Sequence, residues 1–167
     1  MDAAASIEAE LERFRASFLY QPAAFLVDEV LGIDPEQRAI EAVLRTTRAL
    51  PLSDLQRPST SHPPHVSAGD LLQATGSLGC LHAWLFHGCR WDEGWVGFGT
   101  RIHHAHFERL VERGPDLRLS SRELRSRVGP KRVVLRYTFE FFQAGERAYL
   151  GEQSAMFVRA PAAPDVA

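Results

Sequence analysis

The strongest constraint on the fold is a change of hydrophobic period after residue 94. Between Gly69 and Phe86 the apolar residues repeat at helical spacing, which predicts a mostly buried helix about 27 Å long. From Gly94 towards Phe107 the pattern alternates at a period of two, which indicates a long strand. Three further strands are expected over 117–128, 132–142 and 148–158, with Gly129-Pro130 and Ala144-Gly145 as turns. One buried helix followed by four consecutive antiparallel strands predicts a sheet wrapped around a helix.

Two shorter elements and a loop precede the buried helix. Residues 6–18 have the spacing of an amphipathic helix with Ser6 as its N-cap. Residues 25–33 and 38–44 are rich in Val, Leu and Ile and flank a turn sequence, which predicts a hairpin. Residues 50–64 contain four prolines and are expected to form an irregular loop that leads into the buried helix.

Length, charge and cysteine content narrow the class of protein. The 167 residues carry a net charge of -2, which argues against general nucleic-acid binding. No run approaches the ~20 apolar residues of a membrane span, and the first ten residues lack a secretory pattern. We therefore expect a cytoplasmic protein with no membrane span, in which Cys80 and Cys89 are reduced thiols.

Reactive side chains gather where the proline-rich loop enters the helix. His65 could act as a general base because imidazole titrates near neutral pH, and His62 is the second candidate. Asp70 could orient the base or act on water, and Gln73 could hold a carbonyl or the water. Gly69 leaves backbone N–H groups uncrowded at the helix start, where they could bind an oxyanion. The structural alternatives are a loop imidazole bound to backbone, an early-helix carboxylate favoured by the helix dipole, and an ordinary buried amide.

Small residues inside the helix predict that another part of the structure or a ligand lies close to the helix backbone. Gly76 and Gly79, next to Ser77 and Cys80, cost helix stability of up to about 1 kcal/mol per glycine relative to alanine. A strand, a partner helix or a ligand chain could approach there, and Gly76 is a candidate substrate-binding residue. Tight packing alone would explain the same pattern.

A cluster of cations on the last strands is a candidate anion site. Arg125, Lys131 and Arg132, with the other basic residues of this region, could bind the phosphates of coenzyme A or an acidic carrier protein. The alternative is a solvated sheet face balanced by Glu123 and Glu140.

The remaining histidines predict no metal site. Only His104 and His106 share a face of their strand, and no cysteine or paired carboxylate completes a recognisable ligand spacing. We expect His82 and His87 to belong to the packing of the helix and its C-terminus.

The order of the elements resembles the hotdog-fold enzymes that act on acyl chains carried on coenzyme A or acyl carrier protein. Residues 25–30 are similar to the opening strand of the β-hydroxyacyl-ACP dehydratases, and residues 107–117 to their F-x-x-x-V-x-P-G-D-x-L segment with glycine and proline exchanged. The resemblance covers residues 20–159. It implies an α+β hotdog domain there, with a long central helix wrapped by an antiparallel sheet of about five to six strands, and a homodimer. A helix over 1–19 and a flexible tail over 160–167 would flank this domain.

Residues 65–72 resemble the H-x-x-A-x-E-L stretch of the long-chain fatty acyl-CoA thioesterases of the FcoT type, with Asp70 in place of glutamate. The dehydratases instead use a histidine and an acid in a Glu-Ala pair. Here the counterpart of that pair is Gln73-Ala74, and an amide cannot carry the proton. The resemblance therefore implies a thioesterase for a fatty or polyketide-type acyl thioester on coenzyme A or acyl carrier protein, with no cofactor. The alternatives are a 3-hydroxyacyl-ACP dehydratase using His62 or His65, and a non-catalytic acyl-carrier binding or dimerisation module.

Overall fold

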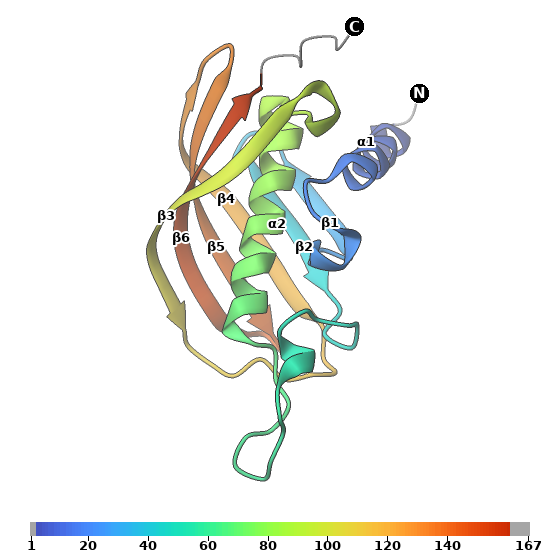
Figure 1. Cartoon of the computed structure of the whole chain (residues 1–167), viewed down its shortest axis with the longest axis vertical. Coiled ribbons are helices and arrows are strands. Elements are labelled where there is room, and N and C mark those ends of the chain that lie inside the picture. Colours follow the sequence, from blue (N-terminus) through green and yellow to red (C-terminus); the bar gives the residue numbers. More distant parts are fainter. Residues whose placement is uncertain (1–2, 161–167) are drawn as a thin grey trace, which may run out of the picture.

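One long helix lies in the curve of a six-stranded antiparallel sheet (Figure 1). The computed structural model describes residues 3–160. The helices are α1 (Ala3–Ser17) and α2 (Ala68–His87), with 3-10 turns at Pro22–Ala24, Ser53–Leu55 and Trp91–Glu93. The strands are β1 (Glu29–Asp34), β2 (Ala39–Leu44), β3 (Trp95–Phe107), β4 (Leu117–Val128), β5 (Arg132–Gln143) and β6 (Glu146–Arg159). These elements confirm the predicted α+β architecture.

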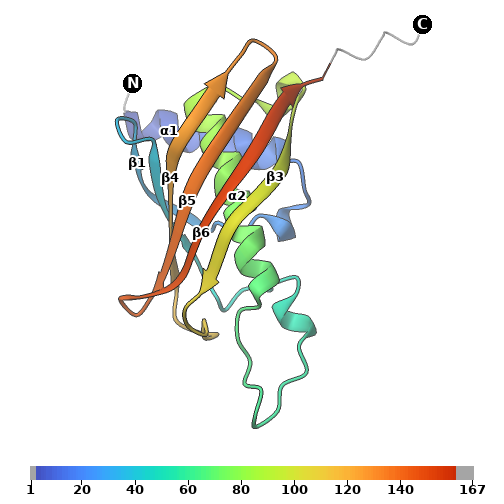
Figure 2. The same cartoon turned by 90° about the vertical axis from the view of Figure 1, so that its left-hand side faces the viewer.

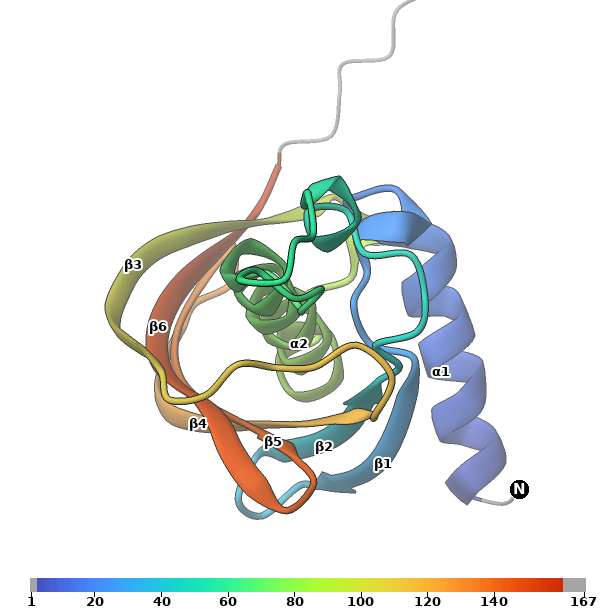
Figure 3. The ribbon, with the colours of Figure 1, turned by 90° about the horizontal axis from the view of Figure 1, so that it is seen from below.

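The sheet has the strand order β1-β2-β4-β5-β6-β3, so β3 returns to pair with β6 at one edge. Figure 3 shows the strands curling around α2, and Figure 2 shows the outer face of the sheet with β3 at its margin. Alternate residues of β5 point at the helix, and Leu135, Tyr137, Phe139 and Phe141 are all buried. The core therefore lies between the concave face of the sheet and α2.

The predicted hairpin is present, but its first strand begins four residues later than expected. Asp34 accepts hydrogen bonds at 2.9 Å from the backbone N–H groups of Glu36 and Gln37, which closes the turn. Before β1, residues 25–27 are buried without pairing as a strand, because the Leu26 N–H donates to Ser77 Oγ on α2 at 3.0 Å. The apolar run at 25–28 therefore reflects burial against the helix, and the predicted strand start at Phe25 is wrong.

The first helix packs beside the C-terminal half of α2 (Figure 1). It begins at Ala3, so Ser6 lies within the helix and the predicted N-cap role of Ser6 is wrong. Phe14 is fully buried and meets the Trp84 ring edge-on at 5.5 Å, while Trp84 Nε1 donates to Glu10 at 3.0 Å. No helix within residues 3–160 is both long and apolar enough to cross a membrane.

Candidate functional site

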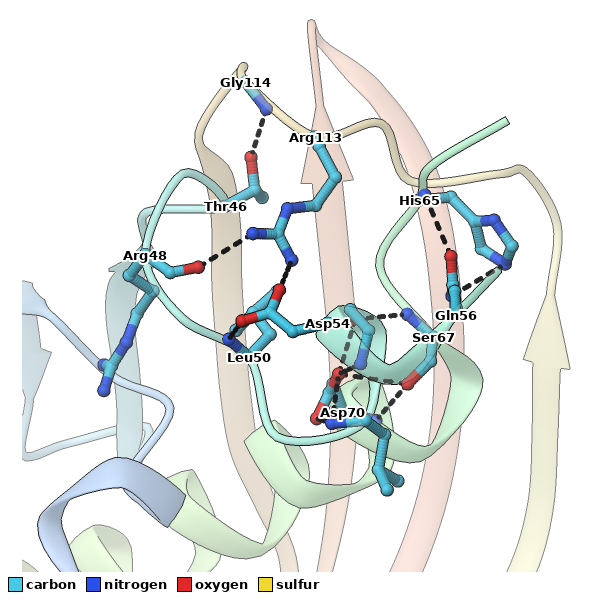
Figure 4. A network of polar contacts seen from close by, with 12 residues as sticks. Thr46, Arg48, Leu50, Asp54, Gln56, His65, Ser67, Asp70, Arg113 and Gly114 are labelled. Carbon is cyan, nitrogen blue, oxygen red and sulfur yellow. Dashed lines mark hydrogen bonds and ion pairs between the residues drawn. The ribbon is translucent and has the colours of Figure 1, made fainter. Parts of the chain in front are cut away.

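The start of α2 is built around the buried carboxylate of Asp70 (Figure 4). Ser67 is the N-cap, and its Oγ accepts a hydrogen bond from the Asp70 N–H at 3.1 Å. The Asp70 carboxylate in turn accepts from the N–H and Oγ of Ser53, at 2.6 and 2.5 Å, from Ser67 Oγ at 3.0 Å and from the Leu52 N–H at 3.1 Å. Asp70 therefore holds the loop before α2 against the first turn of the helix.

A second set of contacts joins the same loop to the connection between β3 and β4 (Figure 4). The Arg113 guanidinium donates to Asp54 Oδ1 and to the backbone carbonyl of Arg48, both at 2.9 Å. Thr46 Oγ1 accepts from the Gly114 N–H at 2.8 Å. These contacts fix the start of the segment 46–67, and the Asp70 network fixes its end at Ser67. The tip of the segment, residues 57–64, projects below α2 (Figure 1).

The two candidate histidines lie in this loop. His65 is half-buried, its Nδ1 lies 2.9 Å from the Pro63 carbonyl oxygen, and its Nε2 lies 3.4 Å from Gln56 Nε2. His62 is exposed, and its ring centroid lies 5.0 Å from that of His65. Within residues 3–160, no hydrogen bond joins either histidine to Asp70, so the structure places the imidazoles and the carboxylate in separate networks.

Gly69 lies under the side chain of Leu52. A Cβ atom at this position would come within 2.3 Å of Leu52 Cδ1, so the glycine makes room for the loop to close over the helix start. This packing reason could not be read from the sequence, because it depends on a residue in the loop. Gly69 does not line any of the cavities described below.

An apolar cavity of about 110 Å³ lies between α2, the edge strand β3 and its neighbours. Gln73 and Gly76 line this cavity, whereas His62, His65 and Asp70 do not. Glycines of both walls, Gly76 and Gly79 on α2 and Gly97 and Gly99 on β3, make the space. The other lining residues are mainly aromatic or small: Tyr20, Thr75, Cys80, Phe98, Tyr137, Phe139, Gln153, Ser154, Ala155 and Phe157.

The polar groups of this cavity are amides and hydroxyls. Gln73 Nε2 donates to the Ala24 carbonyl at 2.8 Å, so the amide oxygen of Gln73 does not take part in this hydrogen bond and can accept another. Thr75 Oγ1 accepts from Gln153 Nε2 at 2.8 Å across the cavity. Burial raises the pKa of Cys80 to about 12, so this thiol stays protonated and is a poor nucleophile. The lining can thus bind a carbonyl or a water molecule, but it holds no carboxylate or imidazole among the described residues.

A larger cavity of about 680 Å³ lies on the outer face of the sheet, under the β4–β5 hairpin. Arg125, Lys131 and Arg132 all line it, together with Arg127 and Arg136. Arg136 is paired with Glu152, whereas the other four cations form no ion pair within the described chain. The acidic residues expected to balance this face point elsewhere, because Glu140 pairs with Arg147 and Glu123 is buried. The structure therefore brings unpaired positive charge to one hollow.

The histidine pair of β3 forms no metal-binding group within residues 3–160. His104 and His106 lie side by side, with ring centroids 5.2 Å apart. The one candidate metal-binding group in the described chain is instead His82, His87 and Glu123, which sequence reasoning missed because Glu123 lies on β4, far along the chain.

Burial and hydrogen bonding shift the pKa values of two members of this group. Burial lowers the pKa of His82, because the charged imidazolium loses its hydration. Burial opposes the ionisation of Glu123, but hydrogen bonds from His82, His87, Ser126 and Arg38 outweigh it and hold its pKa below the ordinary value.

No protein-family model matches the sequence, and no curated protein matches it significantly. Solved structures match the fold along nearly the whole chain. A mutant thioesterase from Pseudomonas aeruginosa is 16% identical with a TM-score of 0.58, over 90% of this chain and 94% of that one. The dehydratase heterocomplex ApeI:P from Xenorhabdus doucetiae is 13% identical with a TM-score of 0.60, over 91% of both chains.

A third likeness is to a hypothetical thioesterase solved with coenzyme A from Streptococcus pneumoniae. It is 12% identical with a TM-score of 0.58, over 87% of this chain and 95% of that one. These sequence identities are low, so the likenesses are informative about architecture. The element order, the sheet topology and these likenesses together show that the chain has the hotdog fold.

Proposed function

We propose that this protein hydrolyses an acyl thioester whose acyl chain enters the cavity between α2 and β3. The observation that carries the proposal is the apolar, glycine-walled cavity with the Gln73 amide on its wall. Apolar walls with a few placed polar groups are the usual form of a small-molecule site. The thioesterases among the structural likenesses support the same assignment.

Hydrolysis would use water and a base from the loop. Gln73 lies five residues after the first residue of α2, about 8 Å along the helix axis from the end at which the loop with the histidines enters the helix. In this mechanism the Gln73 amide holds the carbonyl or the water, while His65 or His62 takes the proton as water attacks the carbonyl carbon. The tetrahedral oxyanion then collapses, the C–S bond breaks, and the thiolate takes up a proton. Asp70 would act through the loop that it holds.

We assign the carrier to the outer cavity. Arg125, Lys131 and Arg132 would bind phosphates by charge-assisted hydrogen bonds, which fits coenzyme A or the phosphopantetheine-bearing surface of a carrier protein. The likeness to a thioesterase solved with coenzyme A supports the first of these.

A homodimer is the assembly we propose. The edge strand β3 is paired on one side only and exposes Phe98, Ile102 and Phe107. An exposed apolar edge of this length favours pairing with a second copy.

One observation favours a second function, the binding of acyl thioesters without turnover. The described cavity lining contains amides and hydroxyls but no carboxylate or imidazole. A module that carries or senses acyl thioesters needs only the cavity and its polar contacts, without an acid or base.

A thiol-release assay separates these functions. The wild-type protein is incubated with acyl-CoA esters of increasing chain length, and free thiol is followed, with 3-hydroxyacyl-CoA and 2-enoyl-CoA esters followed by mass. We expect thiol release that falls at least about tenfold in Gln73→Leu and in the double variant His62→Ala/His65→Ala. The exposed-glutamine variant Gln37→Leu is the control and should match the wild type. Tight binding without thiol release would favour the binding module, and loss of water without thiol release would favour a dehydratase.

A further inference from the structure

Three metal-ligating side chains converge on the side of α2 that faces β4. Glu123 Oε2 lies 2.5 Å from His87 Nε2 and 3.4 Å from His82 Nε2. One ligand atom of each residue lies within 4.8 Å of the others. The side chains of His82, His87 and Glu123 are 0%, 3% and 7% exposed, so the group is closed off from bulk water.

Hydrogen bonding alone leaves this group incompletely satisfied. Both imidazoles place Nε2 near the same carboxylate oxygen. The other ring nitrogen of His82, Nδ1, is buried with no hydrogen-bond partner within residues 3–160, and an ion bound through Nε2 would leave it so. The rings of Phe86 and Tyr137 pack against the His82 ring at centroid distances of 4.6 and 5.0 Å. An imidazole enclosed in this way has lost water without gaining a full set of partners, which costs stability.

The carboxylate is held in place by a residue outside the ligand set. Arg38 donates to Glu123 Oε1 at 2.6 Å, and the Glu123 N–H donates to the Arg38 carbonyl at 3.1 Å. Arg38 adopts a φ of 46°, a left-handed conformation that non-glycine residues rarely take, at the start of β2. Glu123 Oε1 therefore binds the guanidinium, and Glu123 Oε2 points at the two imidazoles. The same arrangement occurs in metal sites where a residue outside the ligand set orients a ligating carboxylate.

We infer that His82, His87 and Glu123 bind one divalent transition-metal ion of the zinc class. Two imidazole nitrogens and one carboxylate oxygen form a ligand set that Zn²⁺ uses, and a solvent molecule would complete four-coordination. Tetrahedral bonds of about 2.0 Å place ligand atoms about 3.3 Å apart. The distance of 3.4 Å between His82 Nε2 and Glu123 Oε2 already matches this spacing. His87 Nε2, now 2.5 Å from Glu123 Oε2, would have to move away from it by about 0.8 Å.

The site would join the last turn of α2 to β4. Tyr137, which packs on His82, also lines the acyl cavity, so the bound ion would brace one wall of that cavity. None of the three ligands lines the cavity itself, and the inference does not depend on the proposed hydrolysis.

Cobalt titration of the metal-stripped full-length protein tests the inference. We expect Co²⁺ to bind at one ion per chain, with visible absorption bands of a four- or five-coordinate ion that added Zn²⁺ removes. His87→Ala and Glu123→Gln should each weaken binding by at least about tenfold. The control variant His104→Ala/His106→Ala removes two histidines of β3 that lie beside each other and outside the proposed metal site. This variant should bind Co²⁺ as the wild type does.

A second readout covers the case in which a ligand variant unfolds. Zn²⁺ should raise the melting temperature of the wild-type protein and of the His104→Ala/His106→Ala control, because an ion that binds only the folded state stabilises it. The inference is overturned if the wild type shows neither Co²⁺ absorption nor a Zn²⁺-dependent rise in melting temperature. It is equally overturned if a folded His87→Ala variant binds Co²⁺ as tightly as the wild type.

Discussion

Among single residues, Asp70 is a candidate catalytic group whose hydrogen bonds give it a structural role. Its carboxylate lies at the start of the buried helix, where a general base could act, yet every hydrogen bond that it accepts within residues 3–160 comes from Leu52, Ser53 or Ser67. The donors that it satisfies are two backbone N–H groups and two hydroxyls of a loop that carries His65. The residue therefore affects chemistry through the position of that loop.

Asp70→Ala should lower the free energy of unfolding by about 2–4 kcal/mol, because buried donors lose a charged acceptor. Urea denaturation measures this change, and the exposed-carboxylate variant Asp116→Ala should stay within about 0.5 kcal/mol of the wild type. An Asp70→Ala protein as stable as the control would show that the loop does not depend on this carboxylate.

At the scale of elements, β2 and β5 were predictable because alternate residues of each strand are buried, and α2 because most of its length is apolar and buried. The start of the first strand was not, because residues 25–27 are as apolar as a strand but bind α2 through Ser77. Gly76 and Gly79 both line the cavity beside α2, but only a Cβ atom at Gly79 would contact a neighbour, Tyr137, whereas one at Gly76 would meet no atom within 4 Å. The structure adds Gly97 and Gly99 on the opposite wall. The contacts of Gly69 with Leu52 and of His82 with Glu123 join distant segments, so no local pattern could reveal them.

The glycine wall of β3 should set the length of the acyl chain. A Cβ atom on Gly99 would meet no atom within 4 Å, so the valine side chain of Gly99→Val can enter the cavity without a clash. Because the valine side chain occupies part of the cavity and so reduces its volume, we expect the variant to fold normally and to prefer acyl-CoA esters several carbons shorter than the wild type does, as measured by kcat/KM across a chain-length series. Gly32→Val, at an equally open position on β1, is the control. An unchanged chain-length profile in Gly99→Val would place the acyl chain elsewhere.

The β4–β5 hairpin should contribute to recognition of the carrier. Arg125→Ala/Lys131→Ala removes two unpaired cations from the outer cavity and should raise KM for acyl-CoA esters about tenfold, with little change in kcat. Acyl-N-acetylcysteamine thioesters serve as control substrates because they lack phosphates. Their KM should be the same with the wild type and with Arg125→Ala/Lys131→Ala. Arg101→Ala removes an exposed cation of β3 outside this cavity and serves as the control. Equal effects on both substrate classes would argue against a phosphate site.

At the scale of the whole molecule, the sheet has one edge suited to assembly. β1 is short and ends one side, whereas β3 spans 13 residues at the other and carries exposed apolar side chains. A second copy that pairs along β3 would bring two acyl cavities close together, because the cavity lies against the same strand.

Ile102→Glu should therefore convert a dimer into monomers, because it puts a charge on the apolar edge, where Ile102 is 52% exposed. Light scattering coupled to size-exclusion chromatography measures the mass. Val128→Glu, an exposed apolar position at the end of β4, should leave the dimer intact. A wild-type protein that is monomeric at all concentrations would contradict the proposed assembly.

In the proposed function, the space between α2 and β3 holds the acyl chain of a thioester. A crystal structure with a non-hydrolysable alkyl-CoA thioether would locate that chain. We predict the alkyl chain between Gly76 and Gly97, with the sulfur atom near the Gln73 amide and the phosphates near Arg125. An alkyl chain bound elsewhere on the protein, with this cavity closed or filled by side chains, would show that the cavity between α2 and β3 is not the acyl site.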